Sequence, residues 1–351
     1  MPGITDAQRT AVATAAAILL AAYPSDSVAQ QQAELVVRVE VETGGPLPGA
    51  LVALVNPADS IVDESLSGPG GRVTLQAVAG QYRVRVRRIG YRPYYTELIA
   101  VPRDDDLIVS VESPRVVFQS MVVSARSQCG RIGDGEATLA SAWEEISKAL
   151  RASELTAEDV SAIGQSIKYR RELGRNRAIV SSDSTFLRTG RNRPFAAIDP
   201  ASLARDGFVR GNVLAGWDYY GPDERVLLSS SFAETHCFTV VRERGRKGQL
   251  GVAFEPVPRR RTADIKGALW IDEETSELRE ITFEYVNADP VDRFDAGGFT
   301  RFRRMPSGAW IVSEWRLRMP RLRMDRTSSR TDVIGYIESG GRVVEAGPPG
   351  T

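Results

Sequence analysis

The residues best suited to catalysis are a histidine and the serines just before it. His236 is the only histidine of the chain, and Ser229, Ser230 and Ser231 lie close to it in sequence. A serine hydrolase would use such groups as base and nucleophile. The chain lacks the GxSxG nucleophile elbow, however, and triads are assembled in space rather than from sequence neighbours. We therefore expect His236 to be a packed or hydrogen-bonding histidine beside Cys237, at the start of a strand.

Metal and phosphate chemistry have little support in the residue types. A zinc peptidase needs a His/Glu/His ligand set around an open zinc position, so a single histidine excludes that class. The glycine-rich segments GPGGR and GRIGDGE lack the GKS/T ending and the strand-to-helix context of a phosphate loop. We expect no metal, no cofactor and no enzymatic activity.

Carboxylate groups could serve a glycosidase, which needs two of them across a cleft. The acidic groups that stand close together in sequence are Glu144/Glu145, Asp272/Glu273/Glu274 and Asp289/Asp292. The first pair falls on a predicted helix surface and the second group falls in a predicted hairpin turn. We interpret these groups as solvated, which places a hydrolase last among the functional hypotheses.

Aromatic and basic clusters are better suited to binding. Exposed aromatic rings stack on sugars or anchor protein interfaces, and arginine runs bind anionic groups. The candidate contact residues are Tyr91, Tyr94 and Tyr95, then Trp217, Tyr219 and Tyr220 in GWDYYGPDE, and Arg259, Arg260 and Arg261. Buried packing is the alternative for both aromatic groups, and a solvated loop is the alternative for the arginines.

The composition bounds the class of protein. The chain has 351 residues, of which 42% are hydrophobic and 26% are charged, as in a folded protein with room for two domains. Its formal net charge is +0, so no overall field favours a nucleic acid as partner. Carbohydrate, lipid or another envelope protein remain as candidate partners.

The N-terminus has the pattern of a secretory signal peptide over residues 1–29. The apolar run from Ala11 to Ala22 is followed by small residues at Ser27 and Ala29, which predict cleavage before Gln30. An uncleaved anchor is the alternative, and we expect no transmembrane span in the mature chain. Export to the periplasm or outer envelope would favour a disulfide between Cys129 and Cys237, and two buried free thiols are the alternative.

Residues 33–112 have the pattern of a β-sandwich. Tyr82, Val84 and Val86 alternate with arginines in the stretch GQYRVRVRRIGYRP, residues 80–93, which is typical of a strand with one buried face. About seven short strands are predicted, separated by turns rich in Gly, Pro and Asp. The predicted strands are Leu35–Val41, Leu51–Val55, Ile61–Leu66, Arg72–Gln76, Gln81–Arg88, Tyr94–Val101 and Leu107–Glu112.

The order PLPGALVALV, GPGGRVTLQAVAGQYRVRVRRIGYRP resembles the carboxypeptidase regulatory-like domain. This resemblance implies a transthyretin-like or carbohydrate-binding-like sandwich, common in bacterial envelope proteins. The fold alone does not specify a sugar ligand.

The rest of the chain has the pattern of an α+β domain over residues 129–345. A linker at 113–128 includes the extended segment Val116–Ala125, and Leu139, Trp143, Ile146 and Leu150 predict an amphipathic helix over 136–152. One helix followed by a meander predicts a curved antiparallel sheet packed on a long helix, with a disordered tail at 346–351. The predicted strands are Ile167–Leu173, Arg177–Ser182, Val226–Leu228, Cys237–Arg242, Leu250–Phe254, Ile265–Ile271, Leu278–Tyr285, Phe299–Arg303, Trp310–Met319 and Asp332–Glu338.

A second resemblance covers part of this domain. Phe254–Pro256, the run Ile265–Asp272 (IKGALWID), Thr275 and Leu278–Ile281 resemble the half-barrel of LolA-like lipoprotein carriers. The leading functional hypothesis is a non-enzymatic exported binding or structural protein of the cell envelope. A lipid or lipoprotein carrier is the first alternative, and it predicts an apolar cavity under the helix.

Overall fold

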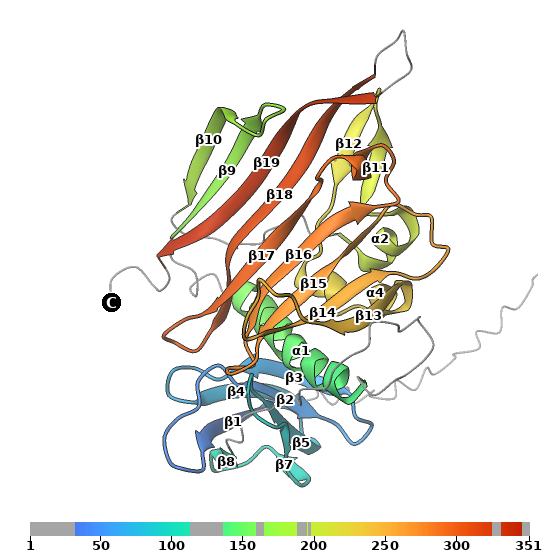
Figure 1. Ribbon diagram of the computed structural model, residues 1–351. Helices are drawn as coiled ribbons and strands as arrows, with labels where there is room; N and C mark the ends of the chain where they lie inside the picture. Colours follow the sequence, from blue (N-terminus) through green and yellow to red (C-terminus); the bar gives the residue numbers. More distant parts are fainter. Residues whose placement is uncertain are drawn as a thin grey trace, which may run out of the picture. The chain divides into compact units, whose positions relative to one another are not determined.

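The computed structural model describes residues 32–112, 136–158, 165–187, 195, 198–324 and 331–345 (Figure 1). The described residues from Gln32 onward belong to one compact unit. The predicted signal peptide at 1–29, linker at 113–128, tail at 346–351 and Cys129 lie outside the described residues. Within them, no helix combines the length and the apolarity that crossing a membrane requires.

The first part of the chain is the predicted β-sandwich. One sheet has the order β4-β1-β8, and the other has the order β3-β2-β5-β6 with β7 also paired to β5. The inward residues Val37, Leu54, Leu75 and Val84 are fully buried between the two sheets. The strands are β1 (Gln32–Val41), β2 (Leu51–Val55), β3 (Ile61–Leu66), β4 (Arg72–Val78), β5 (Gly80–Arg87), β6 (Tyr94–Tyr95), β7 (Ile99–Val101) and β8 (Leu107–Val111).

The predicted single strand Tyr94–Val101 is wrong, because it is divided into β6 and β7. Thr96 lies between them, and its hydroxyl accepts the Val84 N–H at 2.9 Å. A side chain therefore takes the place that a strand carbonyl would occupy, and Leu98 is left exposed.

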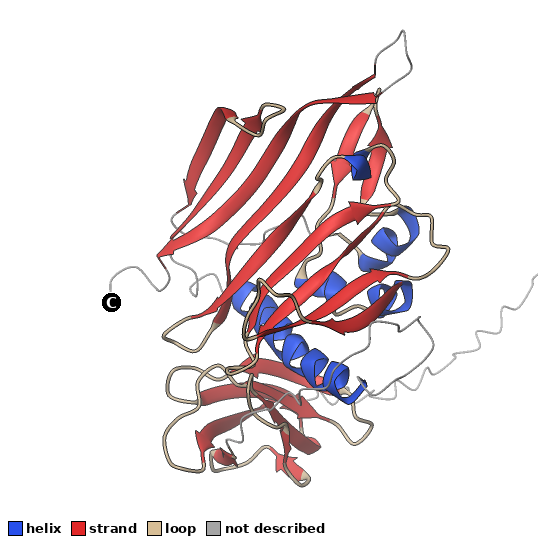
Figure 2. Cartoon of the chain, in the orientation of Figure 1, coloured by secondary structure: helices blue, strands red, loops and turns tan. Residues whose placement is uncertain are grey.

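The second part is a nine-stranded antiparallel sheet in the order β10-β9-β19-β18-β17-β16-β15-β14-β13, with helices packed against it (Figures 1 and 2). The mainly β, two-part architecture is as expected. The elements of this part are α1 (Glu136–Glu158), β9 (Gln165–Leu173), β10 (Ile179–Leu187), α2 (Pro200–Asp206), β11 (Val209–Asn212), β12 (Gly216–Tyr219), α3 (Glu224–Leu227), α4 (Ser230–Thr235), β13 (His236–Val241), β14 (Gln249–Pro256), β15 (Asp264–Asp272), β16 (Leu278–Val286), η1 (Val291–Arg293), β17 (Gly297–Arg304), β18 (Trp310–Met324) and β19 (Thr331–Glu345).

The predicted strand Val226–Leu228 is also wrong, because Val226 and Leu227 belong to helix α3. Asp223 accepts a hydrogen bond from the Val226 N–H at 2.9 Å and caps the helix. The N-cap therefore starts a helix here. The apolar run is too short for its periodicity to distinguish a strand from a helix, which is why the prediction failed.

Alternation along the strands gives the large sheet two different faces. On one face Leu250, Val252 and Leu269 are fully buried in the core that includes the α1 residues Ala142 and Ile146. The intervening residues face away from α1. We call these two surfaces the helix face and the open face of the sheet.

Helix α1 also packs against the sandwich. Leu51 and Ile89 of the sandwich belong to the same core as the buried face of α1. At this contact Lys148 is fully buried and forms a 2.7 Å ion pair with Glu145, which is 2% exposed. Lys148 donates to the Tyr91 carbonyl at 2.8 Å and Glu145 accepts from Gly90 N–H at 2.8 Å, so the charged pair is completed by the sandwich backbone.

A second buried carboxylate reinforces this contact. Glu64 of β3 has a side chain only 3% exposed, and three arginines approach it. Arg151 of α1 does so at 2.7 Å, and Arg85 and Arg87 of β5 do so at 3.4 Å. Two of the arginines that alternate along the predicted strand thus share the carboxylate that binds Arg151 of α1.

Candidate binding groove

The open face carries a groove of about 740 Å³ that crosses strands β13 to β18. Its floor is one row of side chains in direct register: Thr239 opposite Ala253, Ala253 opposite Ala268, and Ala268 opposite Thr282. The row then meets Phe299 and Arg316. Because four neighbouring strands all present a small residue at this row, the sheet surface is hollowed there.

Larger side chains flank the floor on both sides. Trp270, two residues along β15 from Ala268, lies on one side, and the Arg246 guanidinium covers its ring at 4.4 Å. On the other side Lys266 pairs with Glu284 at 2.8 Å. The walls are therefore polar and charged, while the floor is small and nearly neutral.

The β18 end of the groove is rich in arginine. Glu338 is approached by Arg318 at 3.3 Å, Arg171 at 3.6 Å and Arg316 at 3.7 Å, and its side chain is 7% exposed. Arg318 also pairs with Asp295 at 2.7 Å. Burial raises the pKa of nearby Tyr169, and the Glu338 carboxylate raises it further.

Arg316 is held in place by an aromatic ring. Its guanidinium lies 4.8 Å from the Phe299 ring centroid, and that of Arg301 lies 4.3 Å from the same centroid. Arg301 is fixed in turn by Glu280 at 2.9 Å and Glu314 at 2.8 Å. The arginine that closes the floor row is therefore positioned before any ligand arrives.

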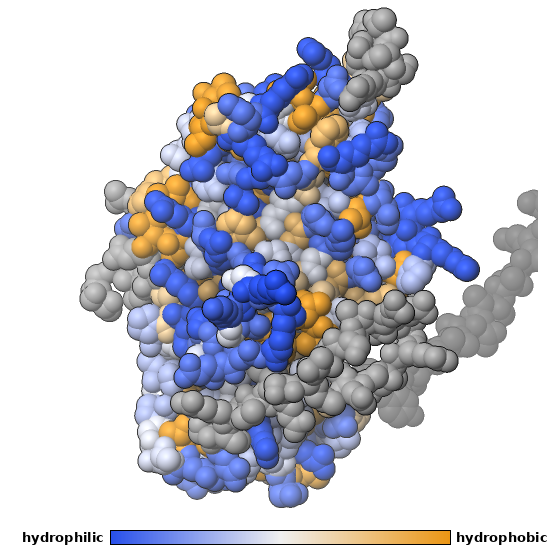
Figure 3. All heavy atoms as spheres, in the orientation of Figure 1, coloured by the Kyte–Doolittle hydropathy of each residue, from blue (hydrophilic) through white to orange (hydrophobic). Residues whose placement is uncertain are grey.

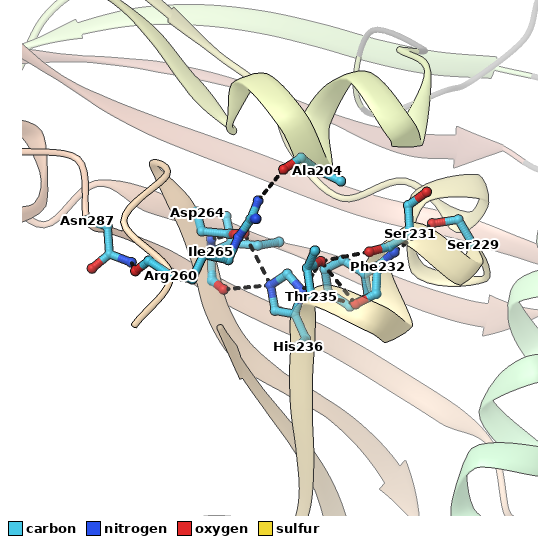
Figure 4. A network of polar contacts seen from close by, with 10 residues as sticks. All are labelled: Ala204, Ser229, Ser231, Phe232, Thr235, His236, Arg260, Asp264, Ile265 and Asn287. Carbon is cyan, nitrogen blue, oxygen red and sulfur yellow. Dashed lines mark hydrogen bonds and ion pairs between the residues drawn. The ribbon is translucent and has the colours of Figure 1, made fainter. Parts of the chain in front are cut away.

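His236 belongs to a buried structural network, shown in Figure 4. Its Nε2 lies 3.2 Å from Asp264 Oδ1, and its Nδ1 lies 3.1 Å from the Phe232 carbonyl. Asp264 is fully buried and also pairs with Arg260. The imidazole stacks on Phe232 with centroids 3.9 Å apart, so it is packed and hydrogen-bonded as expected.

Ser229 and Ser231, two of the serines near His236, take part in the hydrogen bonds of α4. Ser229 caps α4 by accepting the Phe232 N–H at 3.1 Å, and its hydroxyl donates to the Val226 carbonyl. The Ser231 carbonyl accepts from the Thr235 hydroxyl. Figure 4 shows Ser229, which precedes α4, and Ser231, in its first turn, on the far side of Phe232 from the imidazole ring.

The carboxylate groups have different surroundings. The expectation that Glu145 is solvated is wrong, since the sandwich covers it and Lys148 neutralises it. Burial raises the pKa of Glu145 more than Lys148 lowers it. Asp272 lies in the β15–β16 turn and accepts the Glu274 and Thr275 N–H groups. Burial raises the pKa of Asp272, but the hydrogen bonds from Thr275 and the charge of Arg279 have the larger effect, so its pKa is lowered.

The predicted aromatic contact residues do not form one site. Trp217, Tyr219 and Tyr220 are half-buried against the core of the second part. Tyr91 packs against the sandwich core. Tyr94 and Tyr95, 41% and 55% exposed on β6, are the predicted aromatic residues that remain open to solvent.

The three predicted arginines are also separated. Arg260 is half-buried, bound to Asp264 and to the Ala204 carbonyl, so it holds β15 to α2. Arg259, at φ +72°, and Arg261 are exposed. None of the three lines the groove.

The helix face of the large sheet is filled by side chains. Phe195, Phe208, Phe232 and Trp315 are each at most 8% exposed and pack with α1 into one core. The apolar cavity predicted by the carrier hypothesis is thus occupied by the described residues. Among those residues no cluster of three metal-ligating side chains occurs.

The sequence did not predict the groove, because its floor forms only when small residues of neighbouring strands lie opposite one another in the sheet. The one sequence signal is the set of small residues at alternate positions of predicted strands, such as Ala253 and Ala268. Side chains on the surface shown in Figure 3 are mainly hydrophilic, with hydrophobic groups in several separate patches.

Comparison with known proteins identifies the first part of the chain. The carboxypeptidase regulatory-like domain family matches residues 34–113, so the N-terminal sandwich is a domain of this type. A search of the curated proteins finds no match to the chain.

Proposed function

We propose that the protein is a non-enzymatic, exported binding protein of the cell envelope, and that the open face of its second part binds an extended polar ligand. The observation that carries this proposal is the cross-strand groove, with its small floor row and charged walls. A preformed concave site with a few fixed polar groups is what ligand binding requires. The regulatory-like sandwich is compatible with such a role as an accessory module.

Export rests on the sequence pattern of residues 1–29, and the predicted disulfide between Cys129 and Cys237 belongs to the same proposal. Intact mass of the purified mature protein tests both. We expect a chain that begins at Gln30 and gains about 2 Da on reduction. A full-length chain without a mass change would contradict export and the disulfide.

The LolA-like resemblance stays a hypothesis about the fold of the second part. The β15–β16 hairpin that it predicts is present, with Leu269 opposite Ile281. A carrier would use the helix face of the sheet, and the filled core under α1 favours the open face as the binding surface instead.

Blocking the floor of the groove tests the proposed function. Ala268 is 7% exposed at the centre of the floor, so Ala268→Phe should fill the groove. Ala201 is an exposed alanine of α2, and Ala201→Phe is the matched control. Calorimetric titration would use synthetic six-residue peptides and neutral and acidic oligosaccharides as probes.

We expect at least one probe to bind the wild type and the Ala201→Phe variant with equal affinity. Binding to the Ala268→Phe variant should be weaker by about tenfold or more, or roughly 1.4 kcal/mol. Thermal unfolding would verify that Ala268→Phe is folded. Equal binding by all three proteins, or no binding by any probe, would contradict the proposed function.

A further inference from the structure

We infer that the ligand of the groove is an extended peptide segment with a carboxylate at the end that lies on β18. The inference rests on the proposed function and adds the chemical class and the orientation of the ligand. Three features of the groove support this ligand: the direction of the floor row, the charge balance at its β18 end, and the burial of the aromatic rings in its lining.

The floor row fixes the direction and length of the ligand. The Arg316 guanidinium lies over the Phe299 ring of β17, so the row is measured from Thr239 to Phe299. It crosses from β13 to β17, which is four strand spacings. At about 4.8 Å per spacing this distance is about 19 Å. An extended peptide covers about 3.3 Å per residue, so about six residues lie across the strands.

The β18 end of the row has surplus positive charge. Four arginines, Arg171, Arg177, Arg316 and Arg318, share two carboxylates, those of Glu338 and Asp295. Four positive charges against two negative charges leave a local balance of +2.

Some hydrogen-bond donors of these arginines also lack an acceptor. The Nε atoms of Arg171, Arg316 and Arg318 are buried without a hydrogen-bond partner. Arg316, which closes the floor row, is 35% exposed at its side chain. An anionic group of the ligand would therefore meet a fixed guanidinium whose charge is not balanced locally.

The lining favours a peptide over a sugar chain. Trp270, Phe254 and Phe283 line the groove but are at most 6% exposed. The Phe299 ring already contacts the guanidinium groups of Arg301 and Arg316. Buried rings and a ring with cationic partners offer little surface on which a sugar could stack, whereas walls of both charge signs suit a peptide.

Titration of three probes tests the inference. The probes are a six-residue peptide of serine and alanine ending in two glutamates, the same peptide with two glutamines and an amidated C-terminus, and an oligogalacturonate. The variant is Arg316→Gln, and the matched control is Arg303→Gln, which removes the same charge from an exposed residue outside the groove lining.

We expect the acidic peptide to bind most tightly and to lose about tenfold in affinity with Arg316→Gln but not with Arg303→Gln. Its affinity should also fall between about 50 mM and about 300 mM NaCl. Equal affinity of Arg316→Gln and wild type for this peptide would overturn the inference.

The remaining outcomes separate the two proposals. If the glutamine peptide binds as tightly as the acidic one and Ala268→Phe blocks both, the proposed function stands and the carboxylate inference fails. If oligogalacturonate binds most tightly and depends on Arg316, the ligand is an acidic glycan and the peptide assignment is overturned. If Ala268→Phe binds every probe as the wild type does, both proposals fail.

Discussion

Replacing Lys148 by methionine should strongly destabilise the protein in a pH-dependent way. Lys148 is fully buried, and its ammonium group lies 2.7 Å from Glu145 and 2.8 Å from the Tyr91 carbonyl. Removing one partner of a buried ion pair leaves the other charge uncompensated, which costs about 3–5 kcal/mol. We expect the free energy of unfolding at pH 7.5 to fall by about that amount.

The pH dependence follows from the pKa of Glu145. Burial raises this pKa, and Lys148 lowers it, so the variant loses the lowering effect and the pKa rises further. A carboxyl group with a raised folded-state pKa destabilises the fold wherever the unfolded chain ionises more readily than the folded protein. Below the unfolded value, near 4.5, the group is neutral in both states; the penalty grows as the pH rises from there to the folded pKa and is constant above it. The loss should therefore be smaller at pH 5.0 than at pH 7.5.

Urea unfolding followed by tryptophan fluorescence measures both effects. The double variant Lys148→Met with Glu145→Gln removes both charges, and the glutamine oxygen can still accept the Gly90 N–H. It should recover most of the loss at pH 7.5. Lys247→Met, at an exposed lysine, is the control and should change stability by less than about 0.5 kcal/mol. A loss below about 1 kcal/mol for Lys148→Met, or an equal loss at both pH values, would refute the reasoning.

Three further substitutions probe other parts of the fold. Gly49→Ala places a methyl group 2.3 Å from the Gly308 carbonyl oxygen, whereas Gly44→Ala, also at positive φ, meets nothing within 4 Å. Thermal unfolding should therefore show a larger loss of Tm for Gly49→Ala than for Gly44→Ala. Equal losses would argue against the contact with Gly308. Burial raises the pKa of Glu224, so the wild type should lose stability relative to Glu224→Gln as the pH rises from 5 to 8, and a constant difference in Tm would contradict this. His236→Phe keeps a ring but leaves Asp264 with one donor fewer, which should cost about 1–3 kcal/mol in chemical unfolding; an unchanged midpoint would show that the hydrogen bonds of His236 are dispensable.

Alternation and turns in the sequence predict most of the strands. The buried positions of β5 and β14 follow from period-2 patterns, because each strand has one face against a core. Helix α2 was missed although Asp199 and Pro200 form an N-cap signal, since no apolar period of helical length follows them.

Two features could not be predicted, because they depend on pairing between distant segments. The floor of the groove exists only because Ala253 and Ala268 fall in register, and register is not readable from either strand alone. The burial of Glu145 depends on a sandwich backbone more than 50 residues earlier, Gly90 being 55 residues away in sequence. On the helix itself, an acid and a lysine three residues apart look like an ordinary surface pair.

The two faces of the large sheet have a consequence for how this protein can change over evolutionary time. On β14 and β15 the open-face residues of the groove, such as Ala253 and Lys266, alternate with core residues such as Val252 and Leu269, whereas Phe254 contributes to both surfaces. Substitutions at the open-face positions can therefore change the groove while the side chains of the core stay in place. Paralogues could thus acquire new ligand preferences at positions such as 253, 266, 268 and 284 without first gaining spare stability. Among related chains, we expect variation to be concentrated at every second residue of these strands.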